Sequence, residues 1–176
     1  MPAYHSKLNK LADVRIISKM ALLPLKTAVK GPAPPGNPDE PDILDEVIET
    51  WRANILFRNF EVKGPADLVL IYFTVYLSQC LNKIRNKSQE EAKKICFALS
   101  LENFKLPGEA GFPLGGMVSA PANRADADTL KNYLTQARQE LGVRLCDHVY
   151  RGTDNKQPSK WWMQFSKLKF MDLELK

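Results

Sequence analysis

The sequence predicts an all-α fold of about five helices, with one central apolar helix surrounded by the others and an extended N-terminal arm. Apolar residues recur at helical spacing in several separate segments of the chain. The longest apolar run, residues 68–77, continues at helical steps to residue 84, which is too long for an ordinary strand. Prolines crowd the first 41 residues. We therefore expect an extended arm over residues 1–40 and a single helical domain over residues 41–176.

The arm contains a short apolar segment, "MALLPL", at residues 20–25. Pro24 lacks a backbone donor and has a fixed φ, which favours an extended segment or an edge strand over a helix. The stretch "GPAPPGNP" that follows is typical of a polyproline-like linker. The arm is therefore expected to lead into the first helix without being helical itself.

The first helix is expected over residues 41–60. Pro41 suits the first helical position. Acidic residues crowd the start of this segment and arginines lie near its end, and both trends suit the helix dipole. The residues of its apolar stripe are Ile43, Leu44, Val47, Ile48, Trp51 and Ile55.

The second helix begins at Gly64-Pro65 and is expected to stop near Asn86. It is apolar on all sides for about three turns, so other helices must enclose it. Ser88 and Glu91 form a capping-box pattern at the start of a third helix. These signals make the second helix the centre of the domain.

The remaining segments are a loop and two more helices. Residues 105–123 are rich in glycine and proline and form a loop, which Phe112 and Leu114 are expected to anchor on the core. A helix follows over residues 126–150, and Gly142 inside it makes a bend conceivable. Ser159 can cap a last helix that reaches Leu168, with Trp161 and the residues one and two turns later on its core side.

Charge is distributed in blocks along the 176 residues, whose net charge is +5. Residues 1–38 carry six bases and one acid, residues 39–50 carry six acids and no base, and the tail is basic again. Such blocks fit a protein with several charged neighbours as well as they fit a nucleic-acid binder. The three cysteines form no C-x-x-C pair, which favours free buried thiols in a reducing compartment. With no apolar leader visible at the N-terminus, we expect a soluble intracellular protein.

The candidates for catalysis are few. Of the two histidines, His148 lies next to Cys146 and Asp147, but adjacent helical positions point in different directions and cannot form a triad. The loop "LPGEAGFPLGG" lacks the lysine and the hydroxyl residue of a phosphate loop. Glu109 in that loop has no visible partner. We therefore expect no enzymatic activity, no metal and no cofactor.

The segment "PSKWWMQFSKLKFM", residues 158–171, is the strongest candidate for an interaction site. Trp161 is expected in the core and Trp162 on the surface, ringed by Lys160, Lys167 and Lys169 without a compensating acid nearby. The same composition leaves open a stand-alone helical module that binds RNA or a membrane surface.

The N-terminal "MPAYHS" is a second candidate contact, with Tyr4 and His5 as its anchors. An arm that merely folds back on its own domain is an equally good interpretation of this segment. The sequence alone does not choose between the two.

Six ordered stretches resemble one known family. They are "MPAYHS" (1–6), "MALLPL" (20–25), "LPGEAGFPL" (106–114), "RQELGVRLC" (138–146), "PSKWW" (158–162) and "KFM" (169–171). Together they make the chain similar, from end to end, to the family of subunit 3 of the actin-related protein 2/3 complex. The family usually has Gly-Asn where this chain has Ser18-Lys19, and Asn where Asp172 stands.

The resemblance implies an all-helical, non-catalytic subunit of a seven-subunit cytoplasmic assembly that nucleates branched actin filaments. It implies docking on actin-related protein 3, with actin-related protein 2 and the mother filament close by in the active complex. ATP would bind the actin-related subunits and not this chain. Neither nucleic-acid binding, membrane insertion nor self-association into a homo-oligomer is expected.

Overall fold

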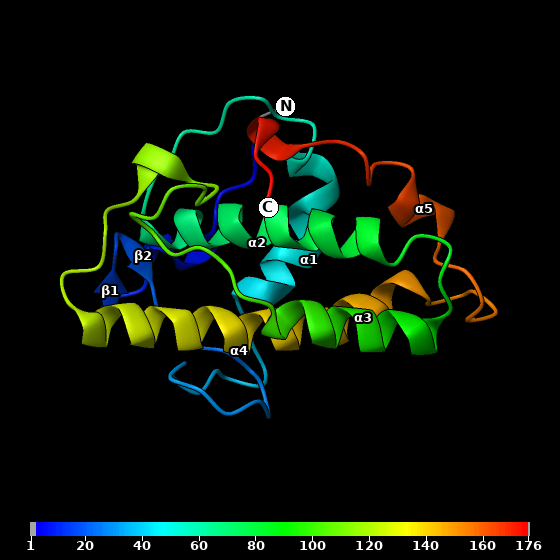
Figure 1. Cartoon of the computed structure of the whole chain (residues 1–176), viewed down its shortest axis with the longest axis horizontal. Coiled ribbons are helices and arrows are strands. Elements are labelled where there is room, and N and C mark those ends of the chain that lie inside the picture. Colours follow the sequence, from blue (N-terminus) through cyan, green and yellow to red (C-terminus); the bar gives the residue numbers. More distant parts are fainter. Residues whose placement is uncertain (1–2, 176) are drawn as a thin grey trace.

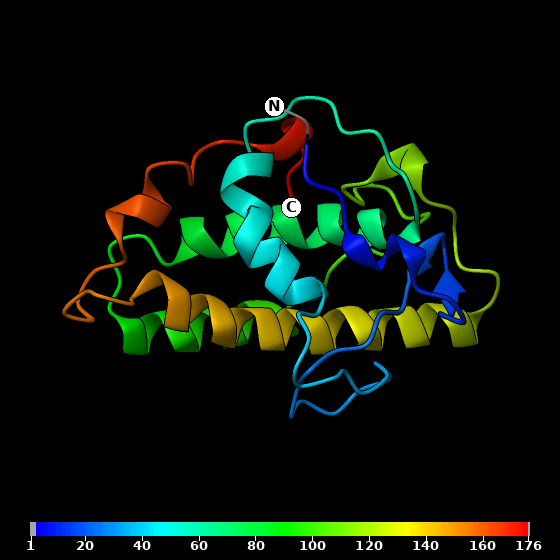
Figure 2. The same cartoon turned by 180° about the vertical axis from the view of Figure 1, so that it is seen from behind.

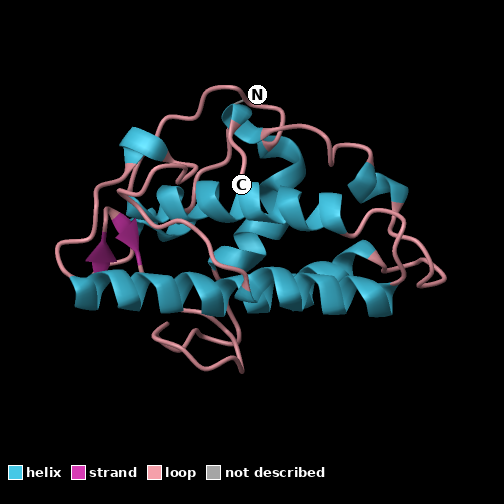
Figure 3. Cartoon of the chain, viewed as in Figure 1, coloured by secondary structure: helices cyan, strands magenta, loops and turns pink. Residues whose placement is uncertain are grey.

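Helices dominate residues 3–175, the part of the chain that the computed structural model describes (Figures 1 and 3). The all-α prediction is confirmed, with a short β-hairpin added in the arm. The α-helices are α1 (Ile43–Asn54), α2 (Pro65–Lys83), α3 (Gln89–Leu101), α4 (Arg124–Val149) and α5 (Lys160–Met163). The other elements are β1 (Ile16–Ile17), β2 (Met20–Ala21) and the 3-10 turns η1 (Lys7–Lys10), η2 (Gly115–Met117) and η3 (Phe170–Asp172).

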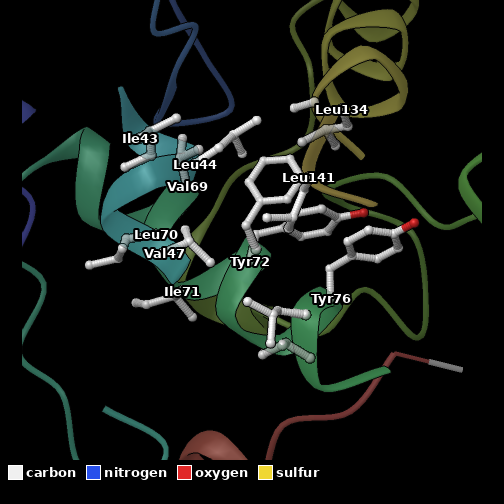
Figure 4. Packing of buried hydrophobic residues seen from close by; sticks show 14 of the residues in the cluster. Ile43, Leu44, Val47, Val69, Leu70, Ile71, Tyr72, Tyr76, Leu134 and Leu141 are labelled. Carbon is white, nitrogen blue, oxygen red and sulfur yellow. The ribbon is translucent and has the colours of Figure 1, made fainter. Parts of the chain in front are cut away.

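The helix α2 is the central element, as predicted. Gly64 is its N-cap and Pro65 occupies the first position, where a missing N–H costs no hydrogen bond. Most of its side chains are buried, including the polar Thr74, whose hydroxyl bonds to the Leu70 carbonyl one turn earlier. The helices α1, α3 and α4, the strand β2 and η1 all contact α2. Figure 2 shows α1 crossing it, and Figure 4 shows apolar side chains of α1, α2 and α4 meeting.

Two helices begin with the reciprocal side-chain caps that their sequences favour. In α1 the Asp42 side chain accepts from the Asp45 amide and Asp45 bonds back to the Asp42 amide. In α3 the predicted pair of Ser88 and Glu91 does the same. The predicted extension of the first helix to residue 60 is wrong, because α1 ends at Asn54, whose buried amide bonds to the backbone of the N-terminal arm.

The long helix α4 runs through Gly142 without interruption. A Cβ atom at this position would lie 3.0 Å from the Cβ of Cys96 on α3. The glycine therefore allows α3 and α4 to approach closely, and it is a packing residue and not a bend. The two helices lie side by side along one edge of the molecule (Figure 1).

The arm lies on the helical domain and buries its apolar segment there. Leu23 has no exposed surface, and its backbone N–H and C=O both bond to the hydroxyl of Tyr133 on α4, at 3.0 Å each. The prediction of an extended segment or strand is confirmed, since Met20 belongs to β2. Ser18 and Lys19 link β1 to β2 with φ of 56° and 70°, the left-handed values of a type I′ turn.

An ion-pair network fastens the arm to α1 and α4. The guanidinium of Arg144 contacts both carboxylate oxygens of Asp42 at 2.6 and 2.8 Å, and it also reaches Asp45 and Glu140. It donates as well to the Lys26 carbonyl at 2.6 Å. Burial by itself would raise the pKa of Asp42, but hydrogen bonds from Arg144 and from two backbone amides outweigh it and lower that pKa.

The tail is less helical than predicted. The helix α5 contains only Lys160–Met163, and a helix as far as Leu168 is not formed. One turn is too short to be stable by itself, so tertiary contacts decide its path. Buried Ser166 donates to the Met163 carbonyl and accepts from Arg85 of the segment after α2, which turns the chain away from the helix axis. In the loop before α4, Phe112 and Leu114 are buried as predicted.

Candidate interaction surfaces

The predicted docking segment, residues 158–171, places one tryptophan in the core and the other on the surface. Trp162 is 7% exposed and stacks on Trp51 of α1, with the ring centroids 5.7 Å apart. Trp161 is 49% exposed. The prediction had these positions reversed and is wrong for both residues. In a helix of one turn, adjacent side chains point about 100° apart, and periodicity alone cannot say which of them faces inward.

Trp161 forms a cation–π cluster with residues of α1 and the tail. The guanidinium carbon of Arg52 lies 4.1 Å from the Trp161 ring centroid and 4.8 Å from that of Phe165. Trp161 also meets Trp162 edge to face at 5.1 Å. We call Arg52, Trp161 and Phe165 the outer cluster. It joins the last turn of α1 to a segment more than 100 residues later in the sequence.

The three predicted lysines do not form one face. Lys167 and Lys169 line a groove of about 520 Å³ beside α2, whereas Lys160 lines a separate hollow with Arg85. Lys169 is paired with Glu174 at 2.8 Å, so the expectation of uncompensated charge is wrong for this residue. Both side chains of that pair are more than half exposed, so it adds little stability.

The N-terminal arm does fold back on its own domain. The Tyr4 backbone exchanges two hydrogen bonds with the Asn54 side chain, of 2.9 and 3.0 Å. His5 Nδ1 lies 2.8 Å from Asp67 Oδ2, and the His5 ring packs on Phe60 at 4.5 Å. The Tyr4 side chain nevertheless stays 52% exposed. The backbone is held while this aromatic ring remains available for a contact.

A buried carboxylate organises this region. Asp67 in the first turn of α2 has no exposed surface and accepts from the backbone amides of Ser6 and Lys63 as well as facing His5. A helix N-terminus favours such a negative charge. Asp67 thus fixes the position of the arm, and sequence reasoning missed it because its partners in the arm, His5 and Ser6, lie about 60 residues earlier.

Next to the arm lies a groove of about 500 Å³ with an acidic rim. Its lining includes Tyr4, Glu40, Glu46 and Glu49. Burial raises the pKa of Glu46, although hydrogen bonds from the Ser6 side chain and the Lys7 backbone amide act in the opposite direction. The surface around Tyr4 therefore differs in charge from the basic tail, in line with the blocks in the sequence.

The chemistry that could support catalysis is sparse in residues 3–175. No group of three or more histidine, cysteine, aspartate or glutamate side chains in this range is arranged to hold a metal ion. Cys80, Cys96 and Cys146 are free and buried. Against the opposing hydrogen bond with Cys146, the contact with Cys80 and burial raise the pKa of Cys96, and the hydrogen bond with Cys96 and burial raise the pKa of Cys146. The Glu109 carboxylate accepts from the Leu106 amide within its own turn. None of the helices in this range is long and apolar enough to cross a membrane.

Arg52 is the functional candidate that sequence reasoning overlooked. Its position near the end of a helix was accounted for by the helix dipole. The only further signal was an exposed aromatic residue in a basic tail, and that signal pointed to Trp162 in place of Trp161. Contact between α1 and the tail depends on the tertiary fold.

Comparison with known proteins shows likeness along the whole chain. The family model described as "P21-Arc: ARP2/3 complex ARPC3 (21 kDa) subunit" matches residues 1–175. Actin-related protein 2/3 complex subunit 3 of Dictyostelium discoideum is 50% identical, over 98% of this chain and 99% of its own length. The protein of that name from Schizosaccharomyces pombe is 49% identical over 99% and 100%, and that from Saccharomyces cerevisiae is 44% identical over 99% and 100%. This chain therefore belongs to the P21-Arc family, the 21 kDa subunit 3 of the ARP2/3 complex.

Proposed function

We propose that this protein is a non-catalytic structural subunit of the ARP2/3 complex, which nucleates branched actin filaments. It docks on actin-related protein 3 and helps to link the complex to actin-related protein 2 and to the mother filament, in the cytoplasmic cytoskeleton at the cell cortex. The observation that carries this proposal is the family match over residues 1–175, together with relatives of the same length that carry the subunit's name.

The fold supports a mechanical role. A central helix enclosed by the other elements makes a rigid body, and such a body can hold surfaces at fixed positions. Two of these surfaces differ in charge, the acidic groove beside Tyr4 and the basic tail with Lys160 and Lys167. Complementary charges orient and accelerate docking more than they raise affinity, which suits assembly with several partners.

The RNA-binding or membrane-binding module is not favoured. Trp162 is buried and Lys169 is paired, so part of the basic C-terminal segment that motivated it is already engaged within the chain. His5 is likewise engaged, with Asp67.

Co-purification tests the proposal. The tagged full chain, expressed in cells, should recover actin-related proteins 2 and 3. Replacing Lys160 and Lys167 by glutamate should reduce this recovery or the number of filament branches, because a basic surface would then repel an acidic one. Lys131→Glu on the exposed side of α4 is the matched control and should leave both unchanged. Recovery of RNA or lipid without actin-related proteins would contradict the proposal.

A further inference from the structure

The guanidinium of Arg52 is held in place but has no polar partner. Two aromatic rings lie against it, Trp161 at 4.1 Å and Phe165 at 4.8 Å. Within residues 3–175, no hydrogen bond or ion pair engages its N–H groups. Glu49 lies one turn earlier on α1, yet it makes no ion pair with Arg52. A side chain whose faces are covered while its N–H edge is free is already oriented for an incoming acceptor.

The other partly buried arginines of the described chain are satisfied. Arg144 contacts three carboxylates, and Arg85 donates to Asn82 and to Ser166. Arg52 is also partly buried, but lacks such an acceptor. This difference is what marks the outer cluster as an incomplete polar site.

We propose that the outer cluster is a binding site for a carboxylate on an acidic segment of a partner protein. Arg52 donates two parallel N–H bonds to the carboxylate, the geometry that a guanidinium fits best. An apolar side chain next to that carboxylate packs on the exposed part of Trp161. The inference rests on the proposed function only in taking the ligand to be a protein.

The ligand is a protein carboxylate and not a phosphate chain for two reasons. Arg52 lies over the Trp161 ring, so one of the two faces on which a base could stack is already taken. Nucleic acid also needs a track of cations, whereas the outer cluster contributes the single guanidinium of Arg52. A membrane surface would need a longer amphipathic helix than the four residues of α5.

The test uses the full chain and a blocked nonapeptide, in which one central leucine is flanked on both sides by aspartates. The matched control peptide has asparagine in place of every aspartate. Binding is measured by calorimetry and by the change in tryptophan fluorescence. In the unaltered protein, the acidic peptide should also shift the side-chain N–H resonance of Arg52, a readout that needs no variant.

Three variants locate the site. Arg52→Gln should weaken binding of the acidic peptide about tenfold or more, because a charge-assisted bidentate contact is lost. Arg52→Lys should fall between Arg52→Gln and the unaltered protein, since an ammonium keeps the charge but lacks the planar fork. Lys131→Gln, a charge loss on the exposed side of α4, should leave the affinity unchanged.

Several results would overturn the inference. They are no detectable binding of the acidic peptide, equal binding by Arg52→Gln, or an equal loss in Lys131→Gln, which would indicate diffuse charge. Tighter binding of a single-stranded RNA decamer, or of vesicles of phosphatidylcholine and phosphatidylserine, through Arg52 would also overturn it. Recovery of actin-related proteins with the Arg52→Gln chain is measured separately, so failure of the peptide site leaves the proposed subunit role standing.

Discussion

Two arginines of this protein lie against pairs of aromatic rings, one in the interior and one at the surface. Arg138 of α4 is 2% exposed, and its guanidinium carbon lies 4.4 Å from the Tyr76 ring and 4.3 Å from the Phe104 ring. We call these three residues the inner cluster. Arg138 donates from one Nη to the Leu99 carbonyl in the last turn of α3, which also accepts from the Glu102 amide. Its Nε and its other Nη have no hydrogen-bond partner in the part of the chain that the structure describes.

The same pair of chemical groups thus serves two different purposes. In the inner cluster the cation caps a helix end, and the rings replace water around it. In the outer cluster the rings orient a cation whose N–H groups remain free. The comparison teaches that contact with a ring does not define the role of an arginine. The two arginines differ in exposure and in having an acceptor, since Arg138 is enclosed and bonded to a carbonyl whereas Arg52 is partly exposed and bonded to none within residues 3–175.

The largest expected effect comes from replacing Trp162, the buried ring that packs against Trp161 of the outer cluster. Trp162→Ala should lower the free energy of unfolding by about 4 kcal/mol, because it removes a buried ring stacked on Trp51. Trp161→Ala should cost about 1 kcal/mol or less, since half of that side chain is in water. Urea titration of both variants measures the difference. Equal losses would mean that the two tryptophans are not divided between core and surface.

The second effect compares the two arginines themselves. Arg138→Ala should cost about 3 kcal/mol, because it leaves a cavity and removes the hydrogen bond to the Leu99 carbonyl. Arg52→Ala should cost less than about 1 kcal/mol. Arg138→Met is the control for volume, and if it is as stable as the parent protein, the buried charge contributes no net stability.

A third arginine, Arg144, extends the comparison to carboxylate partners and gives a pH dependence. The pKa of Asp42 in the folded protein lies below its ordinary value of 3.8, so its stabilising effect is complete above that pH and is lost below it. Urea midpoints should therefore fall as the solution is acidified from about pH 5 to about pH 3. In Arg144→Gln the urea midpoint should fall less over the same pH range.

Glu46 on the same helix acts in the opposite sense. Burial raises its pKa, so protonation as the pH falls through this raised value relieves a cost of folding. Glu46→Gln removes this contribution and lets the slope from Asp42 be read alone. A pH profile that stays unchanged in Arg144→Gln would mean that Asp42 does not depend on that arginine.

The smallest expected effect comes from replacing Lys19, in the turn between β1 and β2, which belongs to neither cluster. Lys19 adopts a positive φ of 70°, which disfavours any side chain with a Cβ. Lys19→Gly should raise stability by about 0.5 kcal/mol, since relief of strain exceeds the entropy that glycine adds to the unfolded chain. Thermal unfolding measures it, and the gain should add to the change in Arg138→Ala because the sites are separate. A loss of stability would mean that Lys19 makes a favourable contact.

The helical body could be predicted from the sequence wherever the signal is local. The all-apolar run of α2, the Ser88 capping box and the anchors of the loop at Phe112 and Leu114 each depend on spacing within a few residues. The predicted helix boundaries were wrong where a contact with a residue distant in the sequence determines the end of the helix. The helix α1 ends at Asn54, whose side-chain amide bonds to the backbone of Tyr4, a partner 50 residues earlier in the sequence.

The candidate site was predictable in part. Its location in the tail followed from the aromatic and basic residues of that segment, whereas Lys160 lies in a separate hollow. The choice between Trp161 and Trp162 depended on which face of a single turn meets Trp51, and that is a tertiary fact. Arg52 could not be found at all, because the rings that orient it follow about 110 residues later.

The contact between Tyr133 and both backbone groups of Leu23 has a consequence for synthesis on the ribosome. The apolar segment around Leu23 leaves the ribosomal exit tunnel early. The part of α4 to which it binds is not synthesised until more than a hundred further residues have been added. A contact between residues as far apart in the sequence as Leu23 and Tyr133 makes the last stage of folding slow. Until then the nascent chain displays this segment to its surroundings, and chaperones that recognise exposed apolar peptide have a natural target there.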